Sequence, residues 1–172
     1  MTTPRIDSPA AFEAVFREHY EALARFAFRF VRDAAAAEDI VQEVFGRLWT
    51  DRHSLNISTS LRAYLYAAVR NRALNISKHV AVIDAFELDE NAMESIAPAQ
   101  PDDALDVAEL HARLAEAFDA LPEKQATVMR LRWHDELTYG EIADALGISI
   151  KGVEKHLSRG LAALRERLGK TR

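Results

Sequence analysis

Hydrophobic residues recur every three to four positions through both ends of the chain, which is the spacing of one buried face of an α-helix. Ser8 followed by Pro9 favours a helix start, because the first turn has no use for the N–H that proline lacks. The pattern predicts a first helix from this point whose apolar stripe consists of Phe12, Val15, Phe16, Leu23, Phe26, Phe30 and Val31.

Two further helices are predicted before residue 80. Asp33 is suited to cap the second, and a polar loop over residues 51–58 separates it from a third helix over residues 60–78. No convincing strand alternation or Asn-Gly hairpin signal occurs in this part of the chain. Three helices of this length can close a small core. The inward positions of the second helix are Ile40, Val41, Val44, Phe45 and Leu48.

The C-terminal part begins with a predicted helix over about residues 105–121, ended by Pro122, and a second helix over residues 122–134. After them, Thr138 and Glu141 have the spacing of a capping box, and Gly147 stands where a helix can end in a left-handed turn. Ser149 can cap the next helix, whose apolar stripe is Val153, Leu157, Leu161, Leu164 and Leu168. A short helix, a glycine turn and a longer helix predict a helix-turn-helix.

The charge is unevenly distributed, and this divides the chain. Residues 1–80 carry 11 basic and 9 acidic residues, residues 81–107 carry 8 acidic and no basic ones, and residues 108–172 carry 11 basic and 10 acidic ones. The expected fold is therefore all-α, with two small helical domains over residues 1–80 and 108–172. An acidic linker over residues 81–107 joins them. Two readings of this linker stay open: a solvated tether, or an acidic strand that occupies a basic nucleic-acid channel of a partner.

Composition excludes several classes of chemistry. The chain has no cysteine, so disulfides, thiolate zinc sites and thiol catalysis are excluded. The six histidines are scattered, and no nucleophile or metal-ligand pattern accompanies the acidic residues, so we expect no catalytic residue, no metal and no cofactor. No signal peptide and no apolar run long enough for a membrane span are present, which predicts no membrane insertion.

The second helix of the predicted helix-turn-helix is the candidate for reading duplex DNA. From Gly147 onward the chain carries 7 basic and 2 acidic residues. Basic side chains can read guanine edges or neutralise phosphates, and glutamate can accept from cytosine. A solvated face of an ordinary bundle is the alternative. The residues that point away from the leucine stripe are Lys151, Glu154, Lys155, Ser158 and Arg159.

The motifs AEDIVQEVF.RLW and LRAYLY..VRN in the first domain, followed by LPEKQATVMRLRW and LTYGEIADALGIS in the second, resemble the sigma-70 family in its extracytoplasmic-function (ECF) group. The resemblance covers residues 12–79 and 108–168. It implies a transcription-initiation factor that directs core RNA polymerase to promoters, not an enzyme, acting in the cytoplasm. It implies contacts of the recognition helix with the −35 element, and a linker that threads toward the polymerase cleft.

In this family the helix that holds EDIVQEVF docks on the clamp of polymerase. The resemblance therefore implies polymerase contacts by Asp39, Gln42, Glu43, Arg47 and Trp49. Solvent-facing acids and a core position for Trp49 are the alternatives.

The third helix is basic and contains no acidic residue, and aromatic rings among cations suit single-stranded DNA. By resemblance, this helix reads the −10 element, and a core position is the alternative for Tyr66. The expected −10 residues are Arg62, Tyr64, Arg70, Asn71 and Asn75, of which Asn71 matches the asparagine of the family's RN motif.

Members of this group are often held inactive by an anti-sigma protein, which makes one an expected partner besides polymerase and promoter DNA. The alternative function is a helix-turn-helix regulator that binds operator DNA as a dimer. The sequence leaves open the promoter, the regulon, the inducing signal and whether the two domains pack on each other without polymerase.

Overall fold

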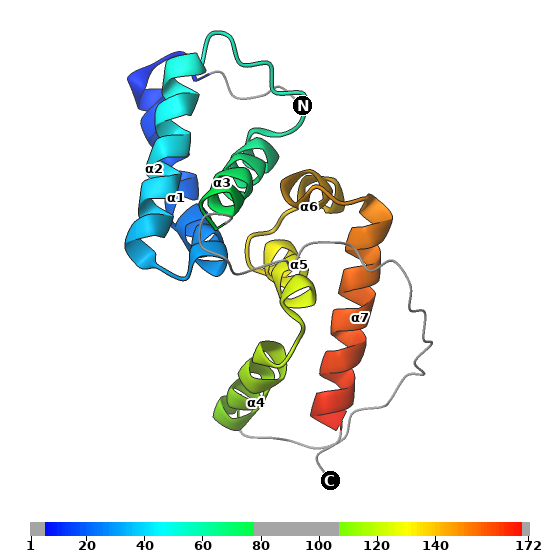
Figure 1. Cartoon of the computed structure of the whole chain (residues 1–172). Helices are drawn as coiled ribbons and strands as arrows, with labels where there is room; N and C mark the ends of the chain where they lie inside the picture. Colours follow the sequence, from blue (N-terminus) through cyan, green and yellow to red (C-terminus); the bar gives the residue numbers. More distant parts are fainter. Residues whose placement is uncertain (1–5, 78–106, 170–172) are drawn as a thin grey trace.

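The computed structural model describes residues 6–77 and 107–169, which fold into seven α-helices without a β-strand (Figure 1). The predicted all-α fold is confirmed. The predicted linker falls outside the described residues except for Val107, which begins α4. The helices are α1 (Pro9–Val31), α2 (Ala34–Asp51), α3 (Leu61–Ser77), α4 (Val107–Asp119), α5 (Glu123–Trp133), α6 (Tyr139–Leu146) and α7 (Ile150–Gly169).

The first two helices begin where their capping residues predict. The Ser8 hydroxyl accepts a hydrogen bond from the Ala11 N–H at 3.2 Å, with Pro9 in the first turn. The Asp33 carboxylate accepts from the Ala36 N–H at 2.7 Å. Each cap satisfies a backbone donor that has no partner inside its helix, which fixes where the helix starts.

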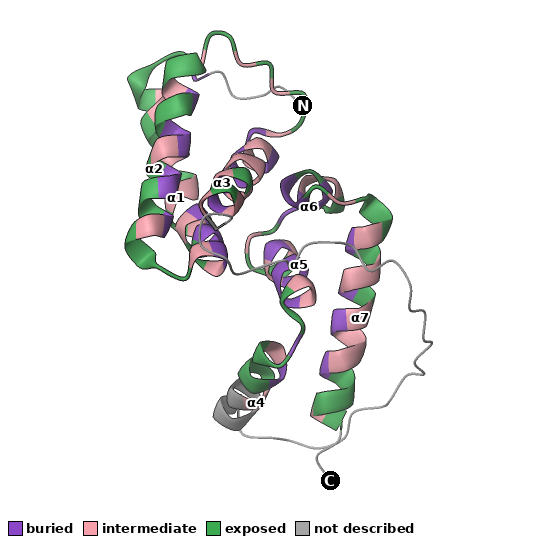
Figure 2. Cartoon of the chain, viewed as in Figure 1, coloured by how far each residue is buried: buried purple, intermediate pink, exposed green. Residues whose placement is uncertain are grey.

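Helices α1, α2 and α3 enclose the first core, with their buried faces turned toward one another (Figure 2). Phe26 is 1% exposed and its ring meets that of Tyr66 at 5.0 Å between centroids, edge to face. Phe45 is met in the same way by Phe16 at 4.9 Å. Tyr66 is 2% exposed, so its core position, left open by the sequence, is the one observed.

The helix-turn-helix is built as the sequence predicts. The Thr138 hydroxyl accepts from the Glu141 N–H at 3.3 Å, and the Glu141 carboxylate accepts from the Thr138 N–H at 2.9 Å, which completes the capping box. Gly147 ends α6 at φ 64°. The Ser149 hydroxyl then accepts from the Gly152 N–H at 3.1 Å in the first turn of α7.

The leucine stripe of α7 faces α4, α5 and α6. Val153, Leu157 and Leu164 are buried, while Leu161 and Leu168 are partly buried against the same core. This packing fixes which side of α7 remains available for a ligand.

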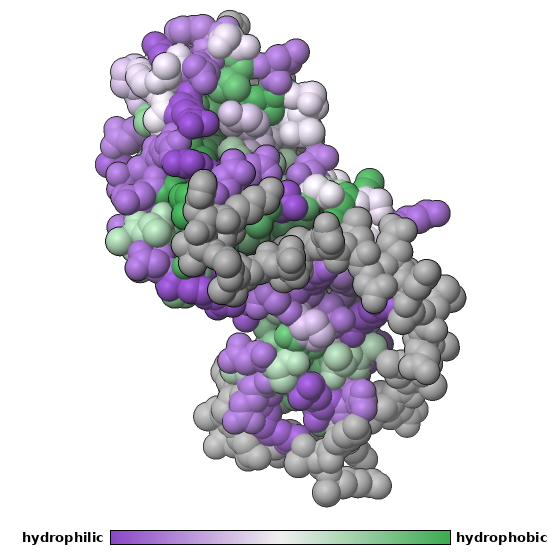
Figure 3. Space-filling view, in the orientation of Figure 1, coloured by the Kyte–Doolittle hydropathy of each residue, from purple (hydrophilic) through white to green (hydrophobic). Residues whose placement is uncertain are grey.

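The two helix groups meet where α6 lies against α3, as Figure 1 shows. On the face seen in Figure 3, hydrophobic residues form small patches among hydrophilic ones. Among the described residues, no helix combines the length and the apolar character needed to cross a membrane.

The turn of the helix-turn-helix requires glycine, and we expect Gly147→Ala to lower the free energy of unfolding by about 1–2 kcal/mol. The positive φ of 64° strains any residue with a Cβ, and that Cβ would lie 3.3 Å from the Arg70 Nη1 atom. Urea unfolding followed by far-UV circular dichroism measures the change.

Gly46→Ala is the matched control, with the opposite sign expected. Gly46 lies inside α2 and a Cβ there would meet nothing within 4 Å, so alanine should stabilise by about 0.5–1 kcal/mol. Equal effects of the two substitutions would contradict the argument from φ.

Candidate nucleic-acid interface

The five predicted −35 residues lie on one face of α7, because their spacings of three and four place them in line along the helix. Lys151, Glu154 and Ser158 are exposed, while Lys155 and Arg159 are half-buried at the edge of this face. The opposite side holds the buried Val153 and Leu157. The structure therefore brings all five residues together on a surface open to solvent.

His156 lies next to this face and was not among the predicted residues. Its pKa is lowered by burial first, and then by the cations Lys124, Arg159 and Lys155. A cluster of three cations around one imidazole indicates a positive potential at this side of α7, as a phosphate-binding surface requires. The sequence signal was only the position of His156 between Lys155 and Arg159.

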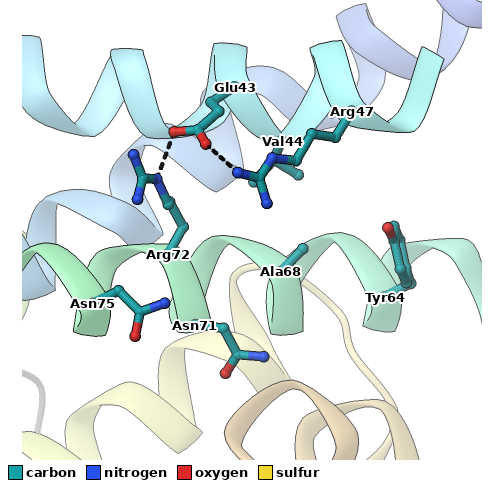
Figure 4. Close-up of a pocket in the computed structure, with 8 residues that line it drawn as sticks. All are labelled: Glu43, Val44, Arg47, Tyr64, Ala68, Asn71, Arg72 and Asn75. Atoms are coloured by element: carbon teal, nitrogen blue, oxygen red, sulfur yellow. Dashed lines mark hydrogen bonds and ion pairs between the residues drawn. The ribbon is translucent and has the colours of Figure 1, made fainter. Parts of the chain in front are cut away.

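A groove of about 200 Å³ runs between α2 and α3 (Figure 4). Three predicted −10 residues line it, namely Tyr64, Asn71 and Asn75, and the two asparagines are exposed. The groove is smaller than the roughly 300–1,000 Å³ typical of sites for drug-sized ligands. Its other lining residues are Glu43, Val44, Arg47, Ala68 and Arg72.

Glu43 occupies the wall of this groove and joins α2 to α3. Its carboxylate accepts from the Arg72 Nε at 2.5 Å and from the Arg47 Nη2 at 2.8 Å (Figure 4). Both carboxylate oxygens are thus used within the chain. Arg72 was noted in the sequence only as one of the basic residues, and the structure shows that it positions the helix that carries Asn71 and Asn75.

The other two predicted −10 residues lie on a different side of α3. The Arg62 Nη2 is 3.4 Å from a carboxylate oxygen of Glu141, and its Nη1 is 3.5 Å from the Asp135 carbonyl oxygen. The Arg70 guanidinium lies over Gly147. The structure therefore divides the predicted −10 residues between the groove and the contact with α6.

The predicted polymerase-binding residues follow one side of α2, where Asp39, Gln42 and Arg47 are exposed. Trp49 differs, since its ring packs against Phe12 at 5.1 Å between centroids and under the Arg52 guanidinium at 4.0 Å. The core alternative for Trp49 therefore describes its packing. Among the described residues, no group of three or more His, Asp or Glu side chains is placed to hold a metal ion.

Two family profiles match the chain, and together they span both helix groups. The profile described as Sigma-70 region 2 matches residues 15–79, which hold nearly all of α1 and the whole of α2 and α3. The profile described as Sigma-70, region 4 matches residues 111–164, which include the helix-turn-helix.

Curated proteins resemble the chain over most of its length. The RNA polymerase sigma-E factor of Streptomyces coelicolor is 31% identical over 157 residues, which cover 91% of this chain and 85% of that protein. The ECF RNA polymerase sigma factor SigW of Bacillus subtilis is 26% identical and covers 92% of this chain and 89% of its own length.

Two solved structures share the fold. The structure of CnrH in complex with the cytosolic domain of CnrY superposes with a TM-score of 0.60 at 22% identity, covering 96% of this chain and 92% of that one. The sigma factor RpoE of Bartonella quintana, in complex with the anti-sigma factor NepR, superposes with a TM-score of 0.60 at 23% identity. It covers 94% of this chain and 98% of that one.

Proposed function

The chain belongs to the sigma-70 family, as an RNA polymerase sigma factor of the ECF group, and on that basis we propose which of its surfaces perform each step of promoter recognition. The function itself is transcription initiation, in which the factor brings core polymerase to specific promoters. We assign the −10 element to the domain of residues 1–80 and the −35 element to the domain of residues 108–172.

The −35 element is bound by the exposed face of α7. A helix of this motif enters the major groove, and its residues there contact base edges and phosphates. Lys151, Lys155 and Arg159 supply positive charge, while Glu154 and Ser158 supply an acceptor and a hydroxyl on the same face. The buried opposite face holds α7 on the rest of the domain, so the helix enters the groove as a rigid element.

The −10 element is bound at the groove between α2 and α3. Unpaired bases expose their hydrogen-bonding edges, and the amides of Asn71 and Asn75 can donate to and accept from them. Tyr64 adds an aromatic ring to the same groove, and Arg62 and Arg70 add charge for the strand backbone. Binding only the unpaired strand shifts the promoter toward the melted state, so we propose no covalent chemistry and no catalytic residue.

The exposed side of α2 is proposed to bind core polymerase through Asp39, Gln42 and Arg47. Glu43 holds α2 and α3 together beneath this surface, and Trp49 supports it by packing. Fixing both DNA-binding domains on one polymerase lets two weak contacts act together. An anti-sigma protein is proposed as a further partner, and the cytoplasm as the place of action.

The division of the chain between two family profiles carries this proposal. A dimeric operator-binding regulator would need the helix-turn-helix alone, whereas residues 15–79 match the region of sigma-70 that accompanies it. The test is transcription in vitro with purified core polymerase on a genomic promoter library, with and without the protein. Transcripts that start at a fixed distance from a shared two-part motif only when the protein is present support it. Specific duplex binding without core, and no new transcripts, would favour the dimeric regulator.

Arg159→Ala is expected to weaken binding of the holoenzyme to a −35 duplex about fivefold to 150-fold, because one bidentate base contact contributes about 1–3 kcal/mol. The loss should be confined to one base position if Arg159 reads a base. If it neutralises a phosphate, the slope of log affinity against log salt should fall by about one instead. A salt titration by fluorescence anisotropy distinguishes the two.

Arg165→Ala is the matched control on the same helix. Arg165 is exposed and lies beyond the proposed contact face. We expect less than a twofold change in affinity. Equal losses for the two arginines would show that α7 contributes only its general charge.

A further inference from the structure

The two domains are joined by a polar contact between α3 and α6. Glu141, which caps α6, also accepts a hydrogen bond from the Ser60 hydroxyl at 2.6 Å and pairs with Arg62. Its side chain is 14% exposed, so water screens this pair only partly. One carboxylate therefore serves both the start of the helix-turn-helix and the start of the −10 helix.

A second tie lies one turn further along α3. The Tyr66 hydroxyl hydrogen-bonds to the Asp135 carboxylate, whose side chain is 7% exposed. The Asp135 carbonyl oxygen also faces Arg62 at 3.5 Å. We call these two ties, of Ser60 and Arg62 with Glu141 and of Tyr66 with Asp135, the α3–α6 latch.

The latch covers one DNA surface and leaves the other open. Arg62 is engaged with Glu141, and Arg70 lies under the turn at Gly147. In contrast, the −35 residues Lys151, Glu154 and Ser158 are exposed in the same structure. The closed chain thus presents its −35 surface complete and its −10 surface without two of its arginines.

The contact is also of a kind that can open. Arg29 lies on α1 beside Asp135, Glu123 and Arg130, and its buried Nη1 atom has no hydrogen-bond partner among the described residues. Burial and, after it, the charge of Arg130 lower the pKa of Arg29 to about 10. A buried cation with an unsatisfied N–H costs free energy, which opening returns by hydrating it.

We propose that the α3–α6 latch is an intramolecular competitor of the −10 strand, so that the free chain recognises −35 duplex while it excludes the melted −10 element. Glu141 holds the guanidinium of Arg62 in the place of a strand phosphate, and the two cannot bind it together. This rests on the proposed −10 role of Arg62 and Arg70. Core polymerase, by holding the domains apart, would release both arginines.

The test uses the full chain without core polymerase and two probes, a −10 non-template single strand and a −35 duplex. The chain has no cysteine, so single cysteines introduced at the exposed Ser54 and Gly169 can carry a fluorescence energy-transfer pair that reports opening. Glu141→Gln keeps an acceptor for the helix cap and for Ser60 but removes the charge that holds Arg62. Tyr66→Phe removes the tie to Asp135 without any change of charge.

We expect each variant to lower energy transfer and to raise affinity for the −10 strand about threefold to tenfold, the size of one charge-assisted hydrogen bond at a partly exposed site. Affinity for the −35 duplex should stay within twofold, which also shows that α6 and α7 remain folded. Asp144→Asn, at an exposed acid three residues further along α6, is the matched control for charge.

Unchanged energy transfer in both variants would overturn the latch. Equal gains from Glu141→Gln and Asp144→Asn would overturn it as well, since a lower negative charge would then explain them. The −10 assignment is tested separately by adding Arg62→Ala to Glu141→Gln. If the domains open and the gain in −10 affinity persists, the latch stands and the assignment of Arg62 fails.

Discussion

Alanine at both Asn71 and Asn75 is expected to lower transcript yield from dependent promoters about a hundredfold or more. Each asparagine is exposed at the groove between α2 and α3, where its amide meets an unpaired base. One lost base contact costs about 1–3 kcal/mol, and a hundredfold change corresponds to about 2.8 kcal/mol. The measurement is a single-round run-off assay with saturating core polymerase, so that differences in polymerase binding do not enter.

A promoter template that is mismatched over the −10 region separates two explanations of that loss. If the asparagines read bases, the loss persists on the pre-opened template, because the contacts are absent there too. If they act only by helping strands to separate, the pre-opened template restores the yield. Arg17→Ala, on the exposed side of α1, is the control and should change the yield less than twofold. A loss of the same size for Arg17→Ala would contradict a role specific to the groove.

Helix starts and the turn at Gly147 could be predicted because their causes are local. A hydroxyl or carboxylate three residues before a backbone N–H caps a helix in almost any surroundings. Likewise, the cost of a positive φ depends on whether residue 147 carries a Cβ. The same reasoning predicted the inward faces of α1, α2 and α7, since burial follows helical periodicity.

The position of the candidate −10 residues on α3 depends on what packs against each side. Residues 62, 66 and 70 recur at four-residue spacing and share one side of the helix, while residues 64, 71 and 75 share another. The sequence therefore contained the division into two sides. It could not show that α6 covers the first side, because Arg62 and Glu141 are 79 residues apart in the chain.

Pairs far apart in the sequence account for the other differences from the prediction. Glu43 carries the charge expected at a polymerase contact, but Arg72, 29 residues away, binds it first. Trp49 has the exposure of a half-buried residue because Phe12 of α1 packs on its ring. In both cases the residue type was compatible with either role, and only the packing of α1, α2 and α3 decides between them.

The same dependence on packing makes α6 the most sensitive short element of the fold. Leu146→Ala is expected to lower the free energy of unfolding by about 2–5 kcal/mol, because a fully buried leucine loses its transfer free energy and leaves a cavity. Leu146 is 0% exposed at the end of α6, and α6 packs against α3, α5 and α7 at once. Urea unfolding followed at 222 nm measures the loss.

Leu114→Ala makes the identical chemical change at a surface position. Leu114 lies on α4 and is 41% exposed, so little area returns to water and we expect a loss below about 1 kcal/mol. The difference between the two variants then isolates burial from the change in helix propensity, which is the same in both. A loss for Leu146→Ala as small as that for Leu114→Ala would mean that α6 is not held in the core in solution. In that case both the helix-turn-helix and the α3–α6 latch would lose their structural basis.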